Sequence, residues 1–264
     1  MDLGLSNKRA IVSGSTAGIG FAIASALAAE GARVTVNGRT QARVDAAVAT
    51  LVGLHPAATI EGVAADLGTE AGAKTLLEAV PAADILVNNL GIFEPKPFLE
   101  IPDEDWRRFF DVNVLSGVRL ARMYLPSMVA KKWGRIVFIS SESGLQIPAE
   151  MIHYGMTKTA QLAVARGIAE SVAGSGVTVN SVLPGPTASE GVGGFVADLA
   201  RAQSKSVPEV EKDFFRDMRP SSLIRRFATV DEVASLVTYV CSERASATTG
   251  SALRVDGGVI RAIA

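Results

Sequence analysis

Short runs of hydrophobic, often β-branched residues alternate along the chain with longer segments in which apolar positions recur with a helical period. The short runs carry no polar stripe, which is typical of β-strands that are buried on both faces. Seven such strands are expected, at residues 9–14, 33–38, 59–64, 84–89, 135–140, 177–182 and 252–257. Amphipathic helices are predicted between them, most clearly at residues 21–30, 41–51 and 153–172.

This alternation predicts the fold class. Consecutive parallel strands need a crossover of about a dozen residues or more, which a helix usually supplies. We therefore expect an α/β protein with a seven-stranded, doubly wound parallel sheet and helices on both faces. No linker or repeat interrupts the pattern, so residues 1–264 are predicted to form a single domain.

One segment, residues 187–220, breaks the rhythm. It has glycine-rich and helical parts but no predicted strand. Long connections of this kind often form binding loops, so this segment is a candidate substrate-binding lid. The alternative is an ordinary helical excursion.

Composition and charge narrow the class of protein. Hydrophobic residues make up 48% of the chain, charged residues 20%, and the net charge is -1, which leaves no basic surplus for binding nucleic acid. No apolar core of a signal peptide and no run of about 18 apolar residues is present, so a cytoplasmic location without membrane contact is expected. With one cysteine, Cys241, and two histidines, His55 and His153, neither an internal disulfide nor a His/Cys metal cluster is expected.

A glycine-rich turn, "IVSGSTAGIG" at residues 11–20, follows the first predicted strand and opens the first helix. Gly14, Gly18 and Gly20 let a ligand approach the backbone, and a helix N-terminus offers free N–H groups to a phosphate. The spacing differs from the G-x-G-x-x-G fingerprint of dinucleotide sites. An alternative is the nucleophile elbow of hydrolases, which "GSTAG" resembles with Thr16 in place of serine. That elbow normally follows several strands, whereas this turn follows the first.

The end of the second predicted strand bears on the choice of dinucleotide. NAD sites usually have an acidic residue there, which binds the ribose 2′-hydroxyl. Here Asn37 occupies the position and Arg39 follows it. A guanidinium suits a 2′-phosphate in charge and in shape, so NADP(H) is favoured over NAD(H). The alternative is that Arg39 is a solvated residue before the next helix.

Several motifs, in their order and spacing, carry a resemblance that spans nearly the whole chain. They are "SGSTAGIG" at 13–20, "ADL" at 65–67, "NNLG" at 88–91, Asn113 in "DVNVLSG", "IVFISSESG" at 136–144, "YGMTK" at 154–158 and "LPGPT" at 183–187. In these motifs the chain resembles the classical short-chain dehydrogenase/reductase family. It departs from the family pattern at Ser13 and Leu90, where threonine and alanine are usual.

The resemblance implies a Rossmann fold, a nicotinamide cofactor and hydride transfer at an alcohol or ketone carbon. It also implies a cofactor site made of Gly14, Ser15, Thr16, Gly18, Ile19, Gly20, Asn37, Arg39, Asp66, Leu67, Asn89, Gly91, Tyr154, Lys158, Pro184, Gly185 and Thr187.

The same resemblance implies a catalytic group of Asn113, Ser141, Tyr154 and Lys158. Tyr154 and Lys158 lie one helical turn apart, and a nearby cation lowers a tyrosine pKa towards the range of a general acid and base. Ser141, thirteen residues before Tyr154, would bind the substrate oxygen, and Ser140 is expected to face the sheet. Asn113 matches a residue that kinks its helix and holds a water. A direct catalytic function of His153 is not expected, because neighbouring residues of a helix point about 100° apart.

A mostly apolar substrate pocket is expected from Phe93, Glu94, Ser143, Leu145, Met151 and Phe195. Such a pocket favours NADP(H)-dependent reduction of a 3-oxoacyl-type or other apolar ketone. Enzymes acting on acyl carrier protein tend to carry basic residues for it, and "KKWGR" at 131–135 partly matches that pattern. Ser175 stands where such enzymes tend to have arginine, so docking of a carrier protein is left open. The alternatives are an NAD-dependent secondary or sugar alcohol dehydrogenase and a non-catalytic NAD(P)-binding sensor. The resemblance further implies a homotetramer with a small-molecule carbonyl or alcohol substrate.

Overall fold

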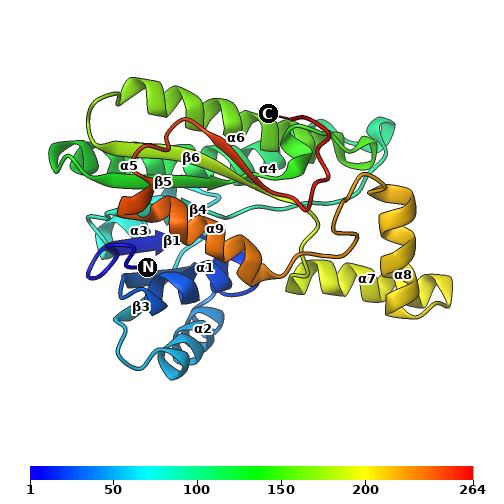
Figure 1. Ribbon diagram of the computed structural model, residues 1–264, viewed down its shortest axis with the longest axis horizontal. Helices are drawn as coiled ribbons and strands as arrows, with labels where there is room; N and C mark the ends of the chain where they lie inside the picture. The colour runs from blue at the N-terminus through cyan, green and yellow to red at the C-terminus, as the bar shows by residue number, and fades with distance from the viewer. Residues whose placement is uncertain (264) are drawn as a thin grey trace.

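Parallel strands form one sheet, with helices against both of its faces (Figure 1). The computed structural model describes residues 1–263, and all of their side chains except those of residues 195, 198 and 199. In spatial order the seven strands are β3 (Ile60–Ala64), β2 (Arg33–Gly38), β1 (Arg9–Val12), β4 (Ile85–Asn88), β5 (Gly134–Ile139), β6 (Val177–Pro184) and β7 (Ala252–Val255). Each overlaps a predicted strand, so the predicted fold class is confirmed.

Two-sided burial explains why the strands read as continuous apolar runs. Successive side chains of a strand point to opposite faces of the sheet. In β1, Ala10 and Val12 belong to one hydrophobic cluster and Ile11 to the other. β4 and β5 repeat this alternation, so the inner strands need apolar residues at every position.

Different helices cover the two faces. One face carries α1 (Gly18–Ala29), α2 (Gln41–Leu54) and α9 (Val230–Cys241); the other carries α3 (Glu70–Ala79), α5 (Ser116–Ala130) and α6 (Ile152–Ser171), with α4 (Asp103–Phe110) packed against α6. Short 3-10 turns lie at 98–100, 142–144, 149–151 and 243–245, and π-helical turns at 111–115 and 214–218. The helices predicted at 21–30, 41–51 and 153–172 correspond to α1, α2 and α6.

Segment 187–220 leaves the sheet after β6 and forms α7 (Glu190–Gln203) and α8 (Val207–Asp213), which project beside the sheet (Figure 1). The segment has helices and no strand, as the sequence predicted; Thr187 makes an isolated bridge to Ala228. Val196, Ala200 and Val210 form a small core between its helices. The segment is therefore a packed helical unit rather than an open loop.

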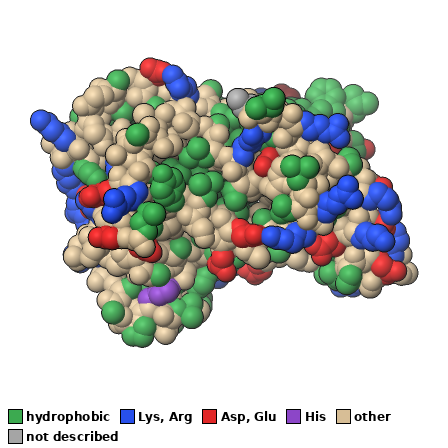
Figure 2. Space-filling model, in the orientation of Figure 1, with side chains coloured by type: hydrophobic (Ala, Val, Ile, Leu, Met, Phe, Trp, Pro, Cys, Tyr) green, Lys and Arg blue, Asp and Glu red, His purple; other side chains and the backbone are tan. Residues whose placement is uncertain are grey.

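The surface carries mixed charge. Lys and Arg side chains are interspersed with Asp and Glu over the face shown in Figure 2, in keeping with the net charge of -1. Among the described residues, no helix is long and apolar enough to cross a membrane.

Two helical glycines give a matched test of the packing. A Cβ on Gly117 in α5 would lie 2.7 Å from Cε1 of the fully buried Phe138, whereas a Cβ on Gly167 in α6 would meet nothing within 4 Å. We predict that Gly117→Ala lowers the free energy of unfolding by about 1–3 kcal/mol through overpacking. Gly167→Ala should raise it by about 0.4–1 kcal/mol by restricting the unfolded chain. Urea denaturation measures both, and a Gly117→Ala variant that is as stable as the wild type, or more stable, would contradict the packing of α5 on β5.

Candidate active site

The glycine turn between β1 and α1 is fastened to the loop after β4. Asn89 Nδ2 donates to the carbonyl oxygens of Ser13 and Gly14, both at 3.0 Å. Ser13 Oγ in turn accepts from the backbone N–H groups of Asn89 and Leu90, both at 3.0 Å. A Cβ on Gly20 would lie 2.5 Å from Asn89 Nδ2, so this position requires glycine. The serine at position 13 thus supplies the hydroxyl that the turn needs.

Asn37, at the end of β2, holds the turn from the other side. Its Oδ1 accepts from the backbone N–H of Gly14 at 3.1 Å, and its Nδ2 donates to the carbonyl oxygens of Val63 and Ala65, each at 3.1 Å. The side chain is buried, its amide oxygen is bound by the turn, and its amide nitrogen is bound by β3 and the loop that follows it. Asn37 therefore holds the backbone of the glycine turn in place, and its own side chain is not exposed to a ligand.

The N-terminus of α1 has the features of a phosphate site. Its N-cap residue, Ala17, makes no side-chain hydrogen bond, and its first turn holds no acidic residue, whereas α9 begins with a complete capping box. Thr16 and Gly18 border a shallow hollow there together with Arg43 and Glu190. Free N–H groups at a positive helix end suit a pyrophosphate, so the turn fits the dinucleotide that the sequence predicted.

Other residues predicted to contact the cofactor lie in different surroundings. Arg39 is exposed just after β2. Asp66 is also exposed, and its Oδ1 accepts from the backbone N–H two residues further on. Leu67 is buried in the core, which leaves only its backbone for a ligand. Ser15 is buried, and its hydroxyl donates at 2.6 Å to the carbonyl of the last residue of β1. Leu67 and Ser15 therefore act through the backbone they position.

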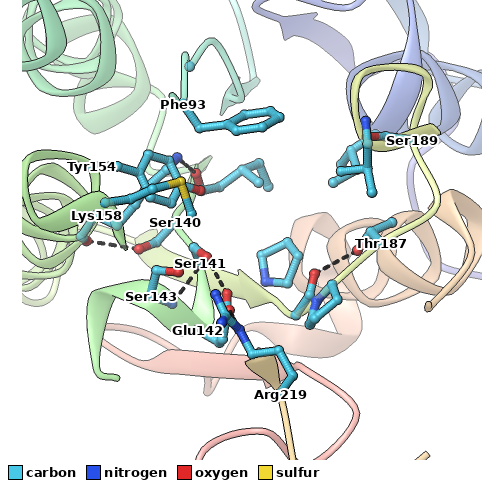
Figure 3. Close-up of a pocket in the computed structure, with 18 of the residues that line it drawn as sticks. Phe93, Ser140, Ser141, Glu142, Ser143, Tyr154, Lys158, Thr187, Ser189 and Arg219 are labelled. Atoms are coloured by element: carbon cyan, nitrogen blue, oxygen red, sulfur yellow. Dashed lines mark hydrogen bonds and ion pairs between the residues drawn. The ribbon is translucent and has the colours of Figure 1, made fainter. Parts of the chain in front are cut away.

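A cavity of about 360 Å³ opens between the carboxyl ends of the strands and segment 187–220 (Figure 3). Many of the predicted cofactor residues border it: Ile19, Asn89, Gly91, Tyr154, Lys158, Pro184, Gly185 and Thr187. Ser141 borders the same space. The cavity thus joins the glycine turn to the predicted catalytic residues.

Tyr154 and Lys158 lie one turn apart on α6 at the cavity wall (Figure 3). Lys158 Nζ is 5.6 Å from the centre of the Tyr154 ring and donates to the carbonyl of Ile139 at 2.9 Å. Burial raises the pKa of Tyr154, and the nearby carboxylate of Glu142 adds to the rise. Burial lowers the pKa of Lys158 to about 8, against the opposing effect of Glu142. The tyrosine is therefore held as a neutral phenol, beside a lysine that titrates near neutrality.

The two adjacent serines after β5 do different things. Ser140 Oγ donates to the carbonyl of Lys158 at 2.8 Å, which commits it to the backbone of α6. Ser141 Oγ donates to Glu142 Oε2 at 2.5 Å and accepts from the backbone N–H of Ser143 at 3.1 Å. Both serines border the cavity and both hydroxyl protons are engaged, that of Ser140 by a backbone carbonyl and that of Ser141 by the side chain of Glu142.

Asn113 lies in the π-helical turn Asp111–Leu115, a bulge between α4 and α5 at the position where the resemblance implied a kink. Its Oδ1 accepts from the backbone N–H of Ile92 at 2.8 Å, and its Nδ2 donates to the carbonyl of Ile92 and to Thr157 Oγ1, both at 3.0 Å. Its own carbonyl accepts from Gln161 Nε2 at 2.6 Å. Asn113 therefore fastens the loop after β4 to α6.

Only some of the residues predicted for the substrate pocket border the cavity. Phe93, Ser143 and Met151 line the cavity, and the Phe93 ring meets the Tyr154 ring edge-on with 6.3 Å between centroids. The side chain of Phe195 lies outside the described part of the structure.

Glu94 and Leu145 do not line the cavity. Glu94 is exposed and pairs with Arg108 at 2.8 Å on the neighbouring helix α4, and Leu145 is also exposed. Both residues follow predicted motifs, "NNLG" at 88–91 and "IVFISSESG" at 136–144. Their loops turn the two side chains towards solvent instead.

Three charged residues of the cavity wall were not predicted from the sequence: Glu142, Glu150 and Arg219. Arg219 Nε lies 3.2 Å from Glu142 Oε1 (Figure 3). Arg219 Nη1 lies 3.2 Å from Glu150 Oε1. For Glu142, its place directly after the predicted catalytic Ser141 is a sequence feature that points to the cavity. Arg219 is 77 residues from Glu142 in the sequence and has no such feature.

His153 packs into the core beside the site. Its ring is buried, 4.1 Å from the Phe109 ring between centroids, and burial lowers the pKa of His153. It is not among the residues lining the cavity. Across the described side chains, no group of three or more His, Cys, Asp or Glu residues could hold a metal ion.

Comparison with known proteins identifies the family. The family model described as enoyl-(acyl carrier protein) reductase matches residues 14–260. The uncharacterized oxidoreductase YvaG of Bacillus subtilis (strain 168) is 48% identical over 263 residues, which cover 100% of both chains. The chain belongs to the short-chain dehydrogenase/reductase family. The predicted enzyme class, an oxidoreductase acting on a CH–OH group, is confirmed with it.

Two further relatives show how widely the family matches along the chain. A D-beta-hydroxybutyrate dehydrogenase of Cupriavidus necator is 34% identical over 260 residues, covering 96% of this chain and 98% of that protein. The L-sorbose reductase of Gluconobacter frateurii, whose structure was solved with NADPH and L-sorbose, has a TM-score of 0.95 at 31% identity and covers 100% of both chains. The short-chain dehydrogenase fold thus extends over the whole chain.

The amide of Asn37 gives a test of the site that needs no substrate. In Asn37→Asp, a carboxylate oxygen would replace the nitrogen that donates to two carbonyl oxygens. We predict a loss of about 1–3 kcal/mol in the free energy of unfolding, because buried acceptors would face one another without a donor. Urea denaturation at neutral pH measures the change. Arg39→Ala, at an exposed position two residues away, is the control and should leave stability close to wild type; an unchanged stability of Asn37→Asp would contradict the bracing function.

Proposed function

We propose that the protein is an NADP(H)-dependent oxidoreductase that transfers a hydride between the nicotinamide and a ketone or secondary alcohol, acting as a carbonyl reductase. One observation carries the proposal: Tyr154, Lys158 and Ser141 border a single cavity that also reaches the glycine turn. A proton donor, a cation beside it and a hydroxyl for the substrate oxygen are the groups that carbonyl reduction needs. The reductase relative solved with NADPH supports the same chemistry.

Each residue of the site then has a defined task. The bound nicotinamide supplies the hydride. Tyr154 donates the proton to the carbonyl oxygen, and the cation of Lys158 stabilises the phenolate that remains. Ser141 hydrogen-bonds the carbonyl oxygen and fixes it beside Tyr154. Asn113 keeps the loop after β4 and the helix of Tyr154 in register, through its bonds to Ile92 and Thr157.

The preference for NADP(H) is proposed from the end of β2. Arg39 is exposed there, where its guanidinium is available to a 2′-phosphate. Asn37 is neutral and buried, so no carboxylate at the end of the strand repels that phosphate. These two features together favour NADP(H) over NAD(H).

Segment 187–220 is proposed to act as a substrate-binding lid. Thr187, Ser189 and Val192 line the cavity from its first part, and Phe214 and Met218 line it from its last part. The aromatic and apolar side chains suit an apolar ketone, with 3-oxoacyl compounds within that class. A homotetrameric assembly and a cytoplasmic location stay predictions from the family resemblance.

Removing the phenol tests the proton donor. Tyr154→Phe should lower kcat for ketone reduction by about 10²–10⁴-fold, the usual contribution of a general acid, while NADPH binding stays close to wild type. Consumption of NADPH over a panel of ketones measures turnover, and fluorescence titration measures binding. Near-normal turnover in the variant would refute the assignment. A wild-type protein that binds NADPH and turns over no ketone or alcohol would instead be a nucleotide sensor.

Removing the guanidinium tests the cofactor preference. Arg39→Ala should raise KM for NADPH by about 10–100-fold, the range expected when a hydrogen-bonded charge pair is lost, and change KM for NADH little. Steady-state kinetics with each cofactor and one shared ketone give the ratio. Equal effects on the two cofactors, or a wild-type preference for NADH, would contradict the assignment of Arg39.

A further inference from the structure

Most of the exposed area of the cavity wall is apolar, yet a charged cluster lies in the wall beside the substrate end. Glu142 and Arg219 are nearly buried, with 7% and 11% of their side chains exposed, and Glu150 is partly exposed at 34%. Arg219 donates to both carboxylates, each at 3.2 Å, and also to the carbonyl of Met218 at 2.9 Å. The proton and hydride transfers proposed above do not require this cluster.

The cluster has an excess of negative charge. Two carboxylates share one guanidinium, and the bonds of Arg219 already point at them. Among the described residues that line the cavity, the other cation is Lys158, which donates to the carbonyl of Ile139 on the side of Tyr154. A carboxylate on the substrate would therefore meet Glu142 without a free cation to balance it, and like charges brought together in a desolvated site are unfavourable.

The proton of Ser141 is also committed to this cluster. A serine hydroxyl has one proton, and that of Ser141 goes to Glu142 Oε2 at 2.5 Å. Ser141 can donate to a substrate carbonyl only when it gives up this bond. The loss is smallest when another donor takes its place on Glu142, because a buried carboxylate that loses a donor is costly. A substrate hydroxyl on the carbon next to the carbonyl is such a donor, since neighbouring oxygens of one molecule would reach Ser141 and Glu142 together.

We propose that Glu142 is a specificity-determining residue that accepts a hydrogen bond from a hydroxyl group adjacent to the reacting carbonyl, so that the preferred substrates are uncharged α-hydroxy ketones with an apolar body. Their reduction gives vicinal diols: the carbonyl carbon gains the hydride, its oxygen gains the proton of Tyr154, and the nicotinamide is oxidised. Arg219 is a positioning residue that holds Glu142 towards Ser141. Phe93, Met151 and Phe214 supply the apolar walls. This inference rests on the proposed carbonyl reductase function.

Three aryl ketones test the inference on the wild-type enzyme. Acetophenone, 2-hydroxyacetophenone and benzoylformate share a phenyl ketone and differ in the group on the carbonyl, which is methyl, hydroxymethyl or carboxylate. A hydrogen bond to a charged acceptor predicts a kcat/KM for 2-hydroxyacetophenone about 10–100-fold above that for acetophenone, with benzoylformate the poorest. Equal values for the first two, or a preference for benzoylformate, would overturn the inference while leaving carbonyl reduction intact. Failure of all three together with every other ketone would refute the proposed function itself.

A matched pair of variants assigns the preference to Glu142. Glu142→Gln keeps the size of the side chain and leaves it one acceptor oxygen, which Arg219 needs because a guanidinium only donates. The amide NH2 then faces the substrate and cannot accept from its hydroxyl, so the ratio of kcat/KM between the hydroxymethyl and methyl ketones should fall towards one. Glu78→Gln removes an exposed carboxylate on α3, away from the cavity, and should keep the wild-type ratio and activity. An unchanged ratio in Glu142→Gln would refute the assignment.

Binding without turnover gives an independent measurement. With oxidised NADP and no reductant, calorimetry can compare the Kd of 2-hydroxyacetophenone with that of acetophenone. The wild-type protein should bind the hydroxymethyl ketone about 10-fold or more tightly than the methyl ketone, and Glu142→Gln should bind both alike. Equal affinities for the wild-type protein would contradict the hydrogen bond to Glu142, whatever the kinetics show.

Discussion

The candidate site depends on the parallel pairing of all seven strands, because parallel strands bring their carboxyl ends to one edge of the sheet. The glycine turn after β1, Asn37 in β2, Asn89 after β4 and Ser141 after β5 meet there although they are far apart in the sequence. The strand order reverses between β1 and β4, which leaves a crevice at that edge. The strand register aligns the ends of the strands. Val12 pairs with Val36 on one side and Val87 on the other, so the loops that follow begin at the same level of the sheet.

Burial of Tyr154 and Lys158 on α6 disfavours the charged form of each side chain, and so shifts both pKa values. It raises the pKa of Tyr154, which on its own would make the phenol a poor proton donor. It lowers the pKa of Lys158 to about 8, which brings the lysine close to losing its charge. The two pKa shifts offset each other only when the groups are adjacent, because the phenolate that the proposed reduction would form stabilises the neighbouring ammonium ion and is stabilised by it. The helical spacing of four residues therefore matters as much as the residue types.

Local patterns were enough to predict the fold, the glycine turn and the convergence of Tyr154, Lys158 and Ser141, because each is written in strand periodicity or in a short motif. The pocket was harder. Nothing local to their loops shows that the side chains of Glu94 and Leu145 turn away from the cavity. The bracing function of Asn37 was also hidden, because it depends on carbonyl groups of β3 and the following loop, 26 and 28 residues away. Contacts made across such distances are fixed by packing rather than by neighbouring residues.

The ion pair of Glu142 and Arg219 is another contact between residues far apart in the sequence, and it is not needed to stabilise the fold. Replacing a buried ion pair by apolar residues of similar volume is often neutral or stabilising, because desolvation offsets the attraction between the charges. Segment 187–220 already has apolar contacts of its own through Val196, Ala200 and Val210. A nearly buried carboxylate that accepts the proton of Ser141 at the cavity wall is better explained by a ligand that supplies the matching donor. The carboxylate of Glu142 then takes part in substrate recognition, and the ion pair with Arg219 stabilises its charge when no substrate is bound.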